Sequence, residues 1–290
     1  MKDDVIGIYK ENYEDIVKKA ISEDLGAYGD ITSEYIFEKD SISKGFIICK
    51  EMEGAVLCGT GIAEYVFKSI DPTVRFKILK NDGEKIKNRE KICTFEGRTV
   101  SILKSERVSL NFISHLSGIA TLTGKFTGIA SDYGVKVTET RKTLPGLRLL
   151  EKYAVRCGGG FNHRFGLFDG IMIKDNHILA CGGISKSIEK IHSKIPHSLK
   201  IEVEVKTEED LNQAIKSKAD IIMLDNMDYR KLRDSVRKIR ENLGRTCIIE
   251  ASGGISLETL EEICKTGIDI VSVGALTNSA KAIDFSLDFE

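Results

Sequence analysis

The segment LKIEVEVKTEEDLNQAIKSKADIIMLD, residues 199–225, contains the pattern that determines the predicted fold. It begins with a short apolar run that ends near Val205 and continues as EEDLNQAIKSK, which has apolar residues at helical spacing. It closes on a second apolar run that ends at Asp225. A strand, a helix and another strand in this order are typical of a parallel β/α unit.

Similar runs recur along the second half of the chain. They are VKVTET near Thr140, GIMIKD near Lys174, TCIIEASGG near Gly253 and IDIVSVG near Gly274. Helical segments such as SLETLEEICKTG fill the gaps between them. Because no GxGxxG motif follows the first run, the series favours a barrel or partial barrel, and a doubly wound sheet is the alternative.

The first half of the chain is different in character. Short strands are predicted between residues 43 and 96, in GFIICK, GAVLCG, VRFKIL and KICTFEG, with glycines between them. Helices are predicted from Tyr13 to Glu23 and from Ile102 to Tyr133, and Thr32 is a candidate helix cap. This part of the chain therefore predicts a separate, sheet-rich module.

The composition limits the possible partners. Hydrophobic residues make up 41% of the chain, charged residues 30%, and the formal net charge is -1, so no bulk attraction to nucleic acid or membranes is expected. No apolar stretch fits a signal peptide, and none approaches the roughly 18 to 20 residues of a membrane helix. The 7 cysteines are odd in number and form no CxxC pair, which favours reduced thiols in a cytoplasm over zinc or disulfides.

Polar residues gather where the predicted barrel strands end. In such barrels the loops at the carboxyl ends of the strands converge and carry the chemistry. The residues at these positions are Arg141, Lys142, Lys174, Asp175, Asp225, Asn226, Ser252, Gly253, Gly254 and Gly274. Their repeated placement predicts a functional site on one rim of the barrel.

The run IEVEV places two acidic side chains on one face of a strand. Side chains alternate along a strand, so Glu202 and Glu204 should point into the barrel while Ile201 and Val203 face the helices. Buried carboxylates require cations or hydrogen-bond donors, and Lys174, a magnesium ion or sugar hydroxyls are the candidates. The alternative is an exposed edge strand with solvated glutamates.

A basic cluster spans residues 139–164. It holds Arg141, Lys142, Arg148, His163 and Arg164 around three consecutive glycines. Arginine and lysine bind carboxylates and phosphates, and glycines let backbone amides approach an anion. The cluster predicts a polyanion site, against a solvated basic loop with a structural histidine as the alternative.

Glycines at the ends of two late strands are the third feature. The tripeptide SGG, residues 252–254, and Gly274 fit the phosphate site that many such barrels carry there. Tight turns between strand and helix are the alternative explanation.

The segment TRKTLPGLRLLEKYAVRCGGGFNHRFGLFDGIMIKDNH, residues 140–177, resembles the signature of the quinolinate phosphoribosyltransferases, which are type II phosphoribosyltransferases. The segments AISEDLGAYGDITS, LNFISHLSGIATLT, EASGGI and VSVGALTNSAKAIDFSL are also similar, so the resemblance covers almost the whole chain. It implies an α/β fold with an N-terminal α/β sandwich domain plus an open (incomplete) α/β barrel. We expect the sandwich at residues 1–115, with the tail 276–290 able to pack with it, and the barrel at residues 116–275.

The resemblance also implies an activity. Members transfer phosphoribosyl from phosphoribosyl pyrophosphate to quinolinate with decarboxylation, which gives nicotinate mononucleotide in NAD biosynthesis. Mg2+ is the implied cofactor, and a homodimer or a multiple of dimers with shared active sites is the implied assembly.

By motif, each site residue receives an implied role. Arg141, His163 and Arg164 bind the carboxylates of quinolinate, and Arg107 reaches in from the partner subunit. The implied catalytic residues are Lys142, Lys174, Glu204 and Asp225. Of these, the two lysines hold phosphoribosyl pyrophosphate, and the two acids meet ribose hydroxyls and magnesium, directly or through water or substrate. The implied phosphate-binding residues are Ser252, Gly253, Gly254, Gly274 and Asn278, the last standing where the family commonly has histidine.

Three other functions remain as alternatives. A relative associated with molybdenum transport shares the RKT-PG and HR-GL patterns but not the stretch KDNH found at residues 174–177. Nicotinate phosphoribosyltransferase acts on a substrate with one carboxylate fewer. A non-catalytic scaffold on the same fold should lack the charged rim that this chain retains.

Overall fold

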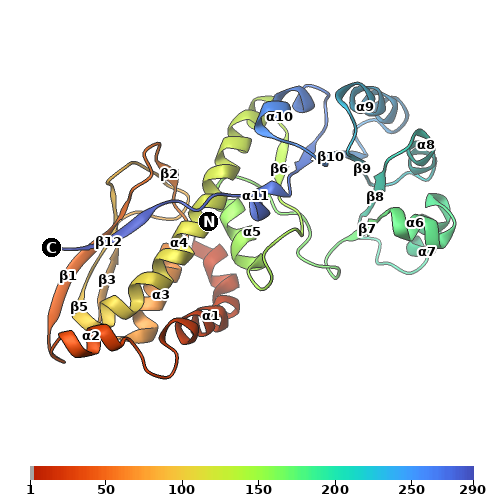
Figure 1. Ribbon diagram of the computed structural model, residues 1–290. Helices are drawn as coiled ribbons and strands as arrows, with labels where there is room; N and C mark the ends of the chain where they lie inside the picture. Colours follow the sequence, from red (N-terminus) through yellow and green to blue (C-terminus); the bar gives the residue numbers. More distant parts are fainter. Residues whose placement is uncertain (1–2) are drawn as a thin grey trace. The chain divides into compact units, whose positions relative to one another are not determined.

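The computed structural model describes residues 3–290, and side chains from Tyr13 onward (Figure 1). The chain divides into two compact units. The N-terminal unit comprises the residues up to Gly124, Thr143–Gly159 and Leu276–Glu290. The barrel unit comprises Lys125–Lys142 and Gly160–Ala275.

The N-terminal unit contains a four-stranded antiparallel sheet in the order β12-β1-β5-β3. Its strands are β1 (Ile42–Cys49), β3 (Arg75–Ile78), β5 (Lys91–Arg98) and β12 (Phe285–Phe289). Two short strands from the same part of the chain, β2 (Ala55–Val56) and β4 (Lys85–Ile86), form a separate antiparallel pair. The runs predicted as strands in this half are confirmed, and the C-terminal β12 joins them by pairing with β1.

Helices complete this unit. They are α1 (Asp3–Leu25), α2 (Ile31–Ile36), α3 (Thr60–Ile70), α5 (Arg148–Cys157) and most of α4 (Thr99–Ala130), which the 3-10 helix Ser131–Tyr133 follows. Asp30 rather than Thr32 caps α2, since its Oδ1 accepts a hydrogen bond from the Ser33 amide at 3.0 Å. The prediction for Thr32 was therefore wrong, because an aspartate two residues earlier satisfies the helix start first.

The core of the N-terminal unit lies between its sheet and its helices. Helix α3 buries Ile62, Val66 and Phe67, which repeat at helical spacing. Phe67 stacks on Phe95 of β5 with ring centroids 5.4 Å apart. The apolar faces of helix and strand thus meet in one buried cluster.

The barrel unit contains a six-stranded parallel sheet in the order β6-β11-β10-β9-β8-β7. The strands are β6 (Lys136–Thr138), β7 (Ile171–Ile173), β8 (Ile201–Val205), β9 (Ile221–Asp225), β10 (Ile248–Ser252) and β11 (Ile270–Ser272). Within the described residues, the end strands β6 and β7 do not pair with each other, so the barrel is open. This confirms the predicted open barrel.

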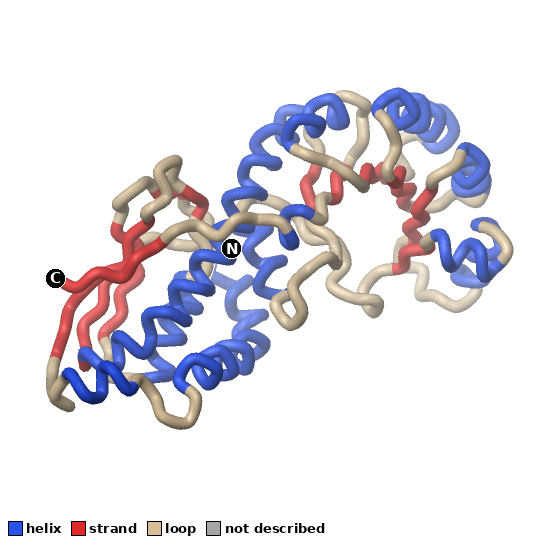
Figure 2. Tube along the Cα trace, viewed as in Figure 1, coloured by secondary structure: helices blue, strands red, loops and turns tan. Residues whose placement is uncertain are grey.

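Helices cover the outer side of the curved sheet (Figure 2). They are α6 (Asp175–Cys181), α7 (Ile184–His192), α8 (Glu208–Lys216), α9 (Tyr229–Leu243) and α10 (Leu257–Cys264). Helix α8 begins at a capping box in which Thr207 and Asp210 exchange hydrogen bonds. Helices α6, α8, α9 and α10 each follow a strand, so the polar turns gather at the carboxyl ends of the strands.

Two sequence expectations concern the rest of the molecule. All 7 cysteines are free thiols, and Cys157 and Cys181 are the partly exposed ones. Within residues 3–290, none of the helices has the length and apolar character needed to cross a membrane.

Candidate active site

A pocket of about 440 Å³ lies at the carboxyl ends of the barrel strands. All of its lining residues belong to the barrel unit. They are Thr140, Arg141, Lys142, His163, Arg164, Met172, Lys174, Glu204, Met223, Asp225, Ser252 and Ser272. The structure therefore brings together four residues of the basic cluster, the inward Glu204 and the late-strand Ser252 that the sequence singled out. The fifth basic residue, Arg148, lies on α5 of the N-terminal unit, where its Nε donates to Thr143 Oγ1 at 3.1 Å.

The basic side of the pocket comes from two loops. Arg141 and Lys142 follow β6 and are exposed, while Arg164 is half-buried on the loop that leads to β7. Arg164 Nη1 donates to the Gly170 carbonyl at 2.8 Å, and its buried Nε has no hydrogen-bond partner within the described chain. Burial and the neighbouring Arg141 lower the pKa of Arg164. This arginine is held in place with a donor left over, which suits an anionic ligand.

Buried glutamates hold the loop that carries His163. Glu139 Oε1 accepts from the His163 amide at 3.1 Å, and Glu139 Oε2 accepts from Asn162 Nδ2 at 3.1 Å. His163 Nε2 lies 3.4 Å from Glu202 Oε2 and 3.5 Å from Glu250 Oε1. The three carboxylates come from three different strands or strand ends, so the barrel itself fixes the loop.

The charge state of His163 follows from these neighbours. Burial by itself would lower the pKa of His163, but Glu202 and Glu250 outweigh it and raise the pKa to about 10. The Arg164 amide, 2.8 Å from His163 Nδ1, favours an unprotonated Nδ1 and works against this rise. Two charge-assisted contacts are stronger than one neutral hydrogen bond, so the upward direction prevails.

The pKa of Glu202 is also raised, but here burial is the main cause. Glu202 is 5% exposed, and burial followed by the nearby Glu250 raises its pKa above the ordinary value. Strand β8 lies between β7 and β9, and all five of its residues are buried. The alternative of an exposed edge strand with solvated glutamates is therefore excluded.

The acidic side of the pocket combines β8 and β9. Lys174 Nζ lies 3.1 Å from Glu204 Oε2, as the sequence predicted for this pair. Lys206 Nζ lies 3.4 Å from Glu204 Oε1 and 3.7 Å from Asp225 Oδ2. Burial and the charge of Glu204 raise the pKa of Asp225.

Glu204 and Asp225 fit a magnesium ion. Mg2+ prefers hard oxygen ligands and is commonly held by one or two carboxylates together with substrate phosphates and water. Both carboxylates line the pocket, and one ammonium group, that of Lys206, lies within 3.7 Å of an oxygen of each, so the two negative charges are close enough to repel. A divalent cation at this point would relieve that repulsion.

The turn after β10 is shaped by glycines. Gly253 and Gly254 adopt φ values of +91° and +63°, which side chains with a Cβ rarely adopt. A Cβ on Gly253 would lie 2.9 Å from the Asn226 amide nitrogen. The same amide donates to the Ser252 carbonyl at 2.8 Å, so the turns after β9 and β10 interlock. Gly274 follows β11, where the buried Ser272 Oγ has no hydrogen-bond partner in the part of the chain described.

Two predicted site residues belong to the other unit. Arg107 is exposed on α4, and Asn278 is exposed at the end of α11 (Ala275–Asn278). Their assigned roles remain predictions.

Sequence reasoning missed Glu139, Lys206 and Glu250. Two of them follow the rule that found Glu202 and Glu204, because Lys206 is the next residue of the same alternation and Glu250 alternates with Ser252 on β10. Glu139 follows β6 directly, so the rule of polar residues at strand ends, which selected Arg141 and Lys142, could have found it.

Family models match nearly the whole of this chain. The model of the N-terminal domain of quinolinate phosphoribosyl transferase matches residues 30–117, and that of the C-terminal domain matches residues 119–288. The chain belongs to the quinolinate phosphoribosyltransferase family.

Individual relatives agree with this membership. A probable nicotinate-nucleotide pyrophosphorylase [carboxylating] of Bacillus subtilis is 44% identical over 92% of this chain and 89% of the relative. A quinolinate phosphoribosyltransferase [decarboxylating] of Nicotiana tabacum is 38% identical over 95% of this chain and 82% of its own length. The solved structure of the nicotinate-nucleotide pyrophosphorylase from Francisella tularensis has a TM-score of 0.89 and 42% identity, covering 97% of this chain and 96% of that one.

Proposed function

We propose that this protein transfers the phosphoribosyl group of phosphoribosyl pyrophosphate to quinolinate. The products are nicotinate mononucleotide, pyrophosphate and carbon dioxide, which is the carboxylating nicotinate-nucleotide diphosphorylase reaction, EC 2.4.2.19, of NAD biosynthesis. The observation that carries the proposal is one pocket with a basic side, formed around Arg141 and Arg164, and an acidic side, formed by Glu204 and Asp225. A dicarboxylate and a metal-bound sugar pyrophosphate need these two sides together.

The quinolinate carboxylates fit the basic side of the pocket. Arg141 and Arg164 supply guanidinium groups that can pair with the two carboxylates, and His163, which also lines the pocket, contributes positive charge. The buried anchors of the loop hold Arg164 and His163 in position before substrate arrives, which reduces the ordering cost of binding.

Phosphoribosyl pyrophosphate fits the rest of the pocket. Lys142 and Lys174 pair with its phosphates, and the turn at residues 252–254 together with Gly274 accommodates the 5-phosphate. Asn278 stands where the family commonly has histidine, and its amide can donate a hydrogen bond but cannot become cationic. Glu204 and Asp225 accept from the ribose hydroxyls.

The chemistry then follows from these positions. A Mg2+ ion held by Glu204 and Asp225 would neutralise negative charge on the leaving pyrophosphate. Glu204 stabilises the positive charge that develops on the ribose ring while the quinolinate nitrogen attacks the anomeric carbon. After transfer, the 2-carboxylate leaves as carbon dioxide, and the cationic ring stabilises the electron pair that stays on C2. A proton from solvent then binds at C2 in place of the carboxylate. Arg141 and Arg164 hold the remaining carboxylate throughout.

The assembly and location form part of this proposal. A homodimer, or a multiple of dimers, in which Arg107 serves the neighbouring site is supported by the family membership. A cytoplasmic location is supported by the free thiols and the lack of a membrane-crossing helix among residues 3–290.

The test is product formation by the purified protein. With quinolinate, phosphoribosyl pyrophosphate and Mg2+, it should release one carbon dioxide and one pyrophosphate for each nicotinate mononucleotide formed. With nicotinate in place of quinolinate, no nucleotide should form. Turnover of nicotinate, or pyrophosphate release without either acid, would replace this proposal with one of the alternative functions.

A further inference from the structure

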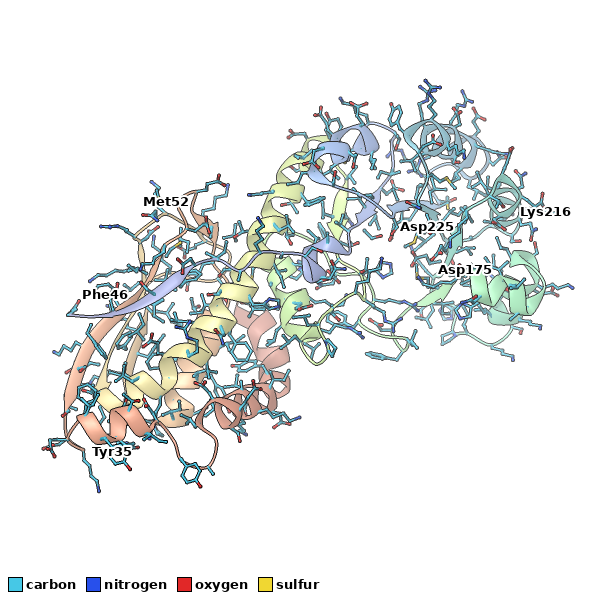
Figure 3. The ribbon with its side chains drawn as sticks, viewed as in Figure 1. Tyr35, Phe46, Met52, Asp175, Lys216 and Asp225 are labelled. Carbon is cyan, nitrogen blue, oxygen red and sulfur yellow. The ribbon has the colours of Figure 1, made fainter. Side chains whose placement is uncertain are left out.

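Lys206 has no role in the function proposed above, yet it lies over the acidic side of the pocket. It follows β8 directly, and its ammonium group contacts two carboxylates that line the pocket, those of Glu204 and Asp225. Its Nζ lies 2.9 Å from Asp175 Oδ2, 3.4 Å from Glu204 Oε1 and 3.7 Å from Asp225 Oδ2. One ammonium group therefore faces three carboxylates from three elements, and Asp175 and Asp225 are marked in Figure 3.

The three contacts differ in strength. The distance to Asp175 falls in the range of charge-assisted hydrogen bonds, about 2.7 to 2.9 Å, whereas the other two are longer. The hydrogen bond to Lys206 lowers the pKa of Asp175, as expected for a firm ion pair. Lys206 is thus anchored to the exposed Asp175 and only attracted to Glu204 and Asp225.

This arrangement leaves the carboxylates of the site already neutralised. Glu204 has an ammonium neighbour on each oxygen, Lys174 at Oε2 and Lys206 at Oε1. Asp225 has the same ammonium group of Lys206 as a cationic neighbour, 3.7 Å from its Oδ2. A divalent ion that binds to Glu204 and Asp225 must therefore displace the ammonium of Lys206 or share the site with it, at a cost in like-charge repulsion.

We propose that Lys206 is a tethered cation that occupies the acidic side of the pocket, so that a divalent metal binds there tightly only together with phosphoribosyl pyrophosphate. This inference rests on the proposed function. The pyrophosphate adds negative charge and metal ligands, which tips the competition towards the metal. Lys206 then stays on Asp175, where its firm hydrogen bond already lies. Lys206 is in this sense a positioning residue that makes metal binding depend on substrate.

Metal binding without substrate gives the most direct test. Mn2+ shares the preference of Mg2+ for carboxylates and can be followed by electron paramagnetic resonance on the whole protein. Four proteins are compared: the natural protein, K206M, K206R and K238M. Lys238 is a matched control, because it pairs with the single exposed carboxylate of Glu208 at 3.0 Å, on helices α8 and α9.

The expected result separates charge from shape. K206M should bind Mn2+ about fivefold more tightly than the natural protein, the factor expected for losing one partly exposed ion pair. K206R keeps the charge and should behave as the natural protein, and so should K238M. With saturating phosphoribosyl pyrophosphate, the natural protein and K206M should differ by less than this factor. A second neutral variant, K206Q, should show the same gain in Mn2+ affinity, and it replaces K206M in the comparison if K206M is poorly folded.

Several outcomes would overturn the inference. Equal Mn2+ affinity in the natural protein and in K206M, or a gain in K206R equal to that in K206M, would show that the charge at this position does not compete with metal. Absence of Mn2+ binding in every variant would do the same. Failure of the proposed function is a separate result, since it shows as absence of nicotinate mononucleotide from the natural protein whatever the Mn2+ affinities are.

Discussion

Lys174 and Glu204 face each other from neighbouring parallel strands, with Nζ 3.1 Å from Oε2. Lys174 follows β7 directly, and Glu204 is the second inward residue of β8, so the register of the two strands brings the charges together. Glu204 is only 8% exposed, and its ion pairs are therefore less screened than those on the surface. In the proposed mechanism, the pair stands between the pyrophosphate bound by lysine and the ribose bound by Glu204.

Glu204→Gln should lower turnover by at least about tenfold while leaving quinolinate binding nearly unchanged. The amide keeps the shape but removes the charge that is assigned to magnesium and to the developing positive charge on ribose. Steady-state kinetics across a range of Mg2+ concentrations would measure the first effect, and calorimetry with quinolinate the second. Glu208→Gln, on the exposed start of α8, is the control. Full turnover at limiting Mg2+ would move the acidic role elsewhere, with Glu202 as the first candidate.

Arg141→Ala should weaken the binding of quinolinate far more than that of phosphoribosyl pyrophosphate. The expected loss is about 1.5 to 3 kcal/mol for quinolinate, the usual value of a hydrogen bond to a charged group. The larger losses found at buried charged groups do not apply, because Arg141 is exposed before substrate binds. Calorimetry with each ligand separately is the measurement, and Arg230→Ala on α9 is a control for loss of an exposed arginine. Equal losses for both ligands would contradict the assignment.

Much of the barrel could be predicted from local pattern. Each strand is a short apolar run followed by a polar turn, so the parallel order and the shared rim follow from chain connectivity alone. The alternation in β8 was enough to place Glu204 in the pocket and to name Lys174 as its partner. The same alternation would have placed Lys206 and Glu250 as well, if it had been extended past Glu204 and applied to the strand that ends at Ser252.

Other features depend on packing that no local pattern records. Glu139 is fully buried because the loop through Asn162 and His163 folds back onto it, which connects residues more than twenty positions apart. Helix α5 belongs to the N-terminal unit although it lies between two strands of the barrel unit in sequence. Tertiary contacts decide both features, and the sequence shows only that the segments are helical or polar.

Glu250→Gln should flatten the alkaline loss of stability. The pKa of His163 is raised from its ordinary 6.5 to about 10, so its stabilising effect is complete below pH 6.5 and is lost as the pH rises towards 10. Removal of one of the two carboxylates lowers the folded-state pKa and shrinks this window. The measurement is the Tm at pH values from 6.5 to 10 for the natural protein and the variant.

The matched control for this prediction is Glu258→Gln. Glu258 is exposed on α10, and a hydrogen bond from Ser256 lowers its pKa, so it titrates only at acid pH. The control should keep the slope of the natural protein between pH 6.5 and 10. If Glu250→Gln keeps it as well, the carboxylates do not hold a proton on His163.

Activity should return when two inactive variants, Arg107→Ala and Lys174→Ala, are mixed under conditions that allow subunit exchange. Arg107 is exposed on α4 of the N-terminal unit, and Lys174 lines the pocket of the barrel unit. If Arg107 serves the neighbour's site, a mixed dimer holds one site with both defects and one with neither. At equal amounts and random exchange, half of the dimers are mixed, so about a quarter of all sites should be intact. Activity is measured as nicotinate mononucleotide formed, and exchange is verified with differently tagged chains. Mixing each variant with itself is the control and should give no recovery. No recovery in the mixed sample, with exchange verified, would show that Arg107 acts on its own subunit or only supports the fold.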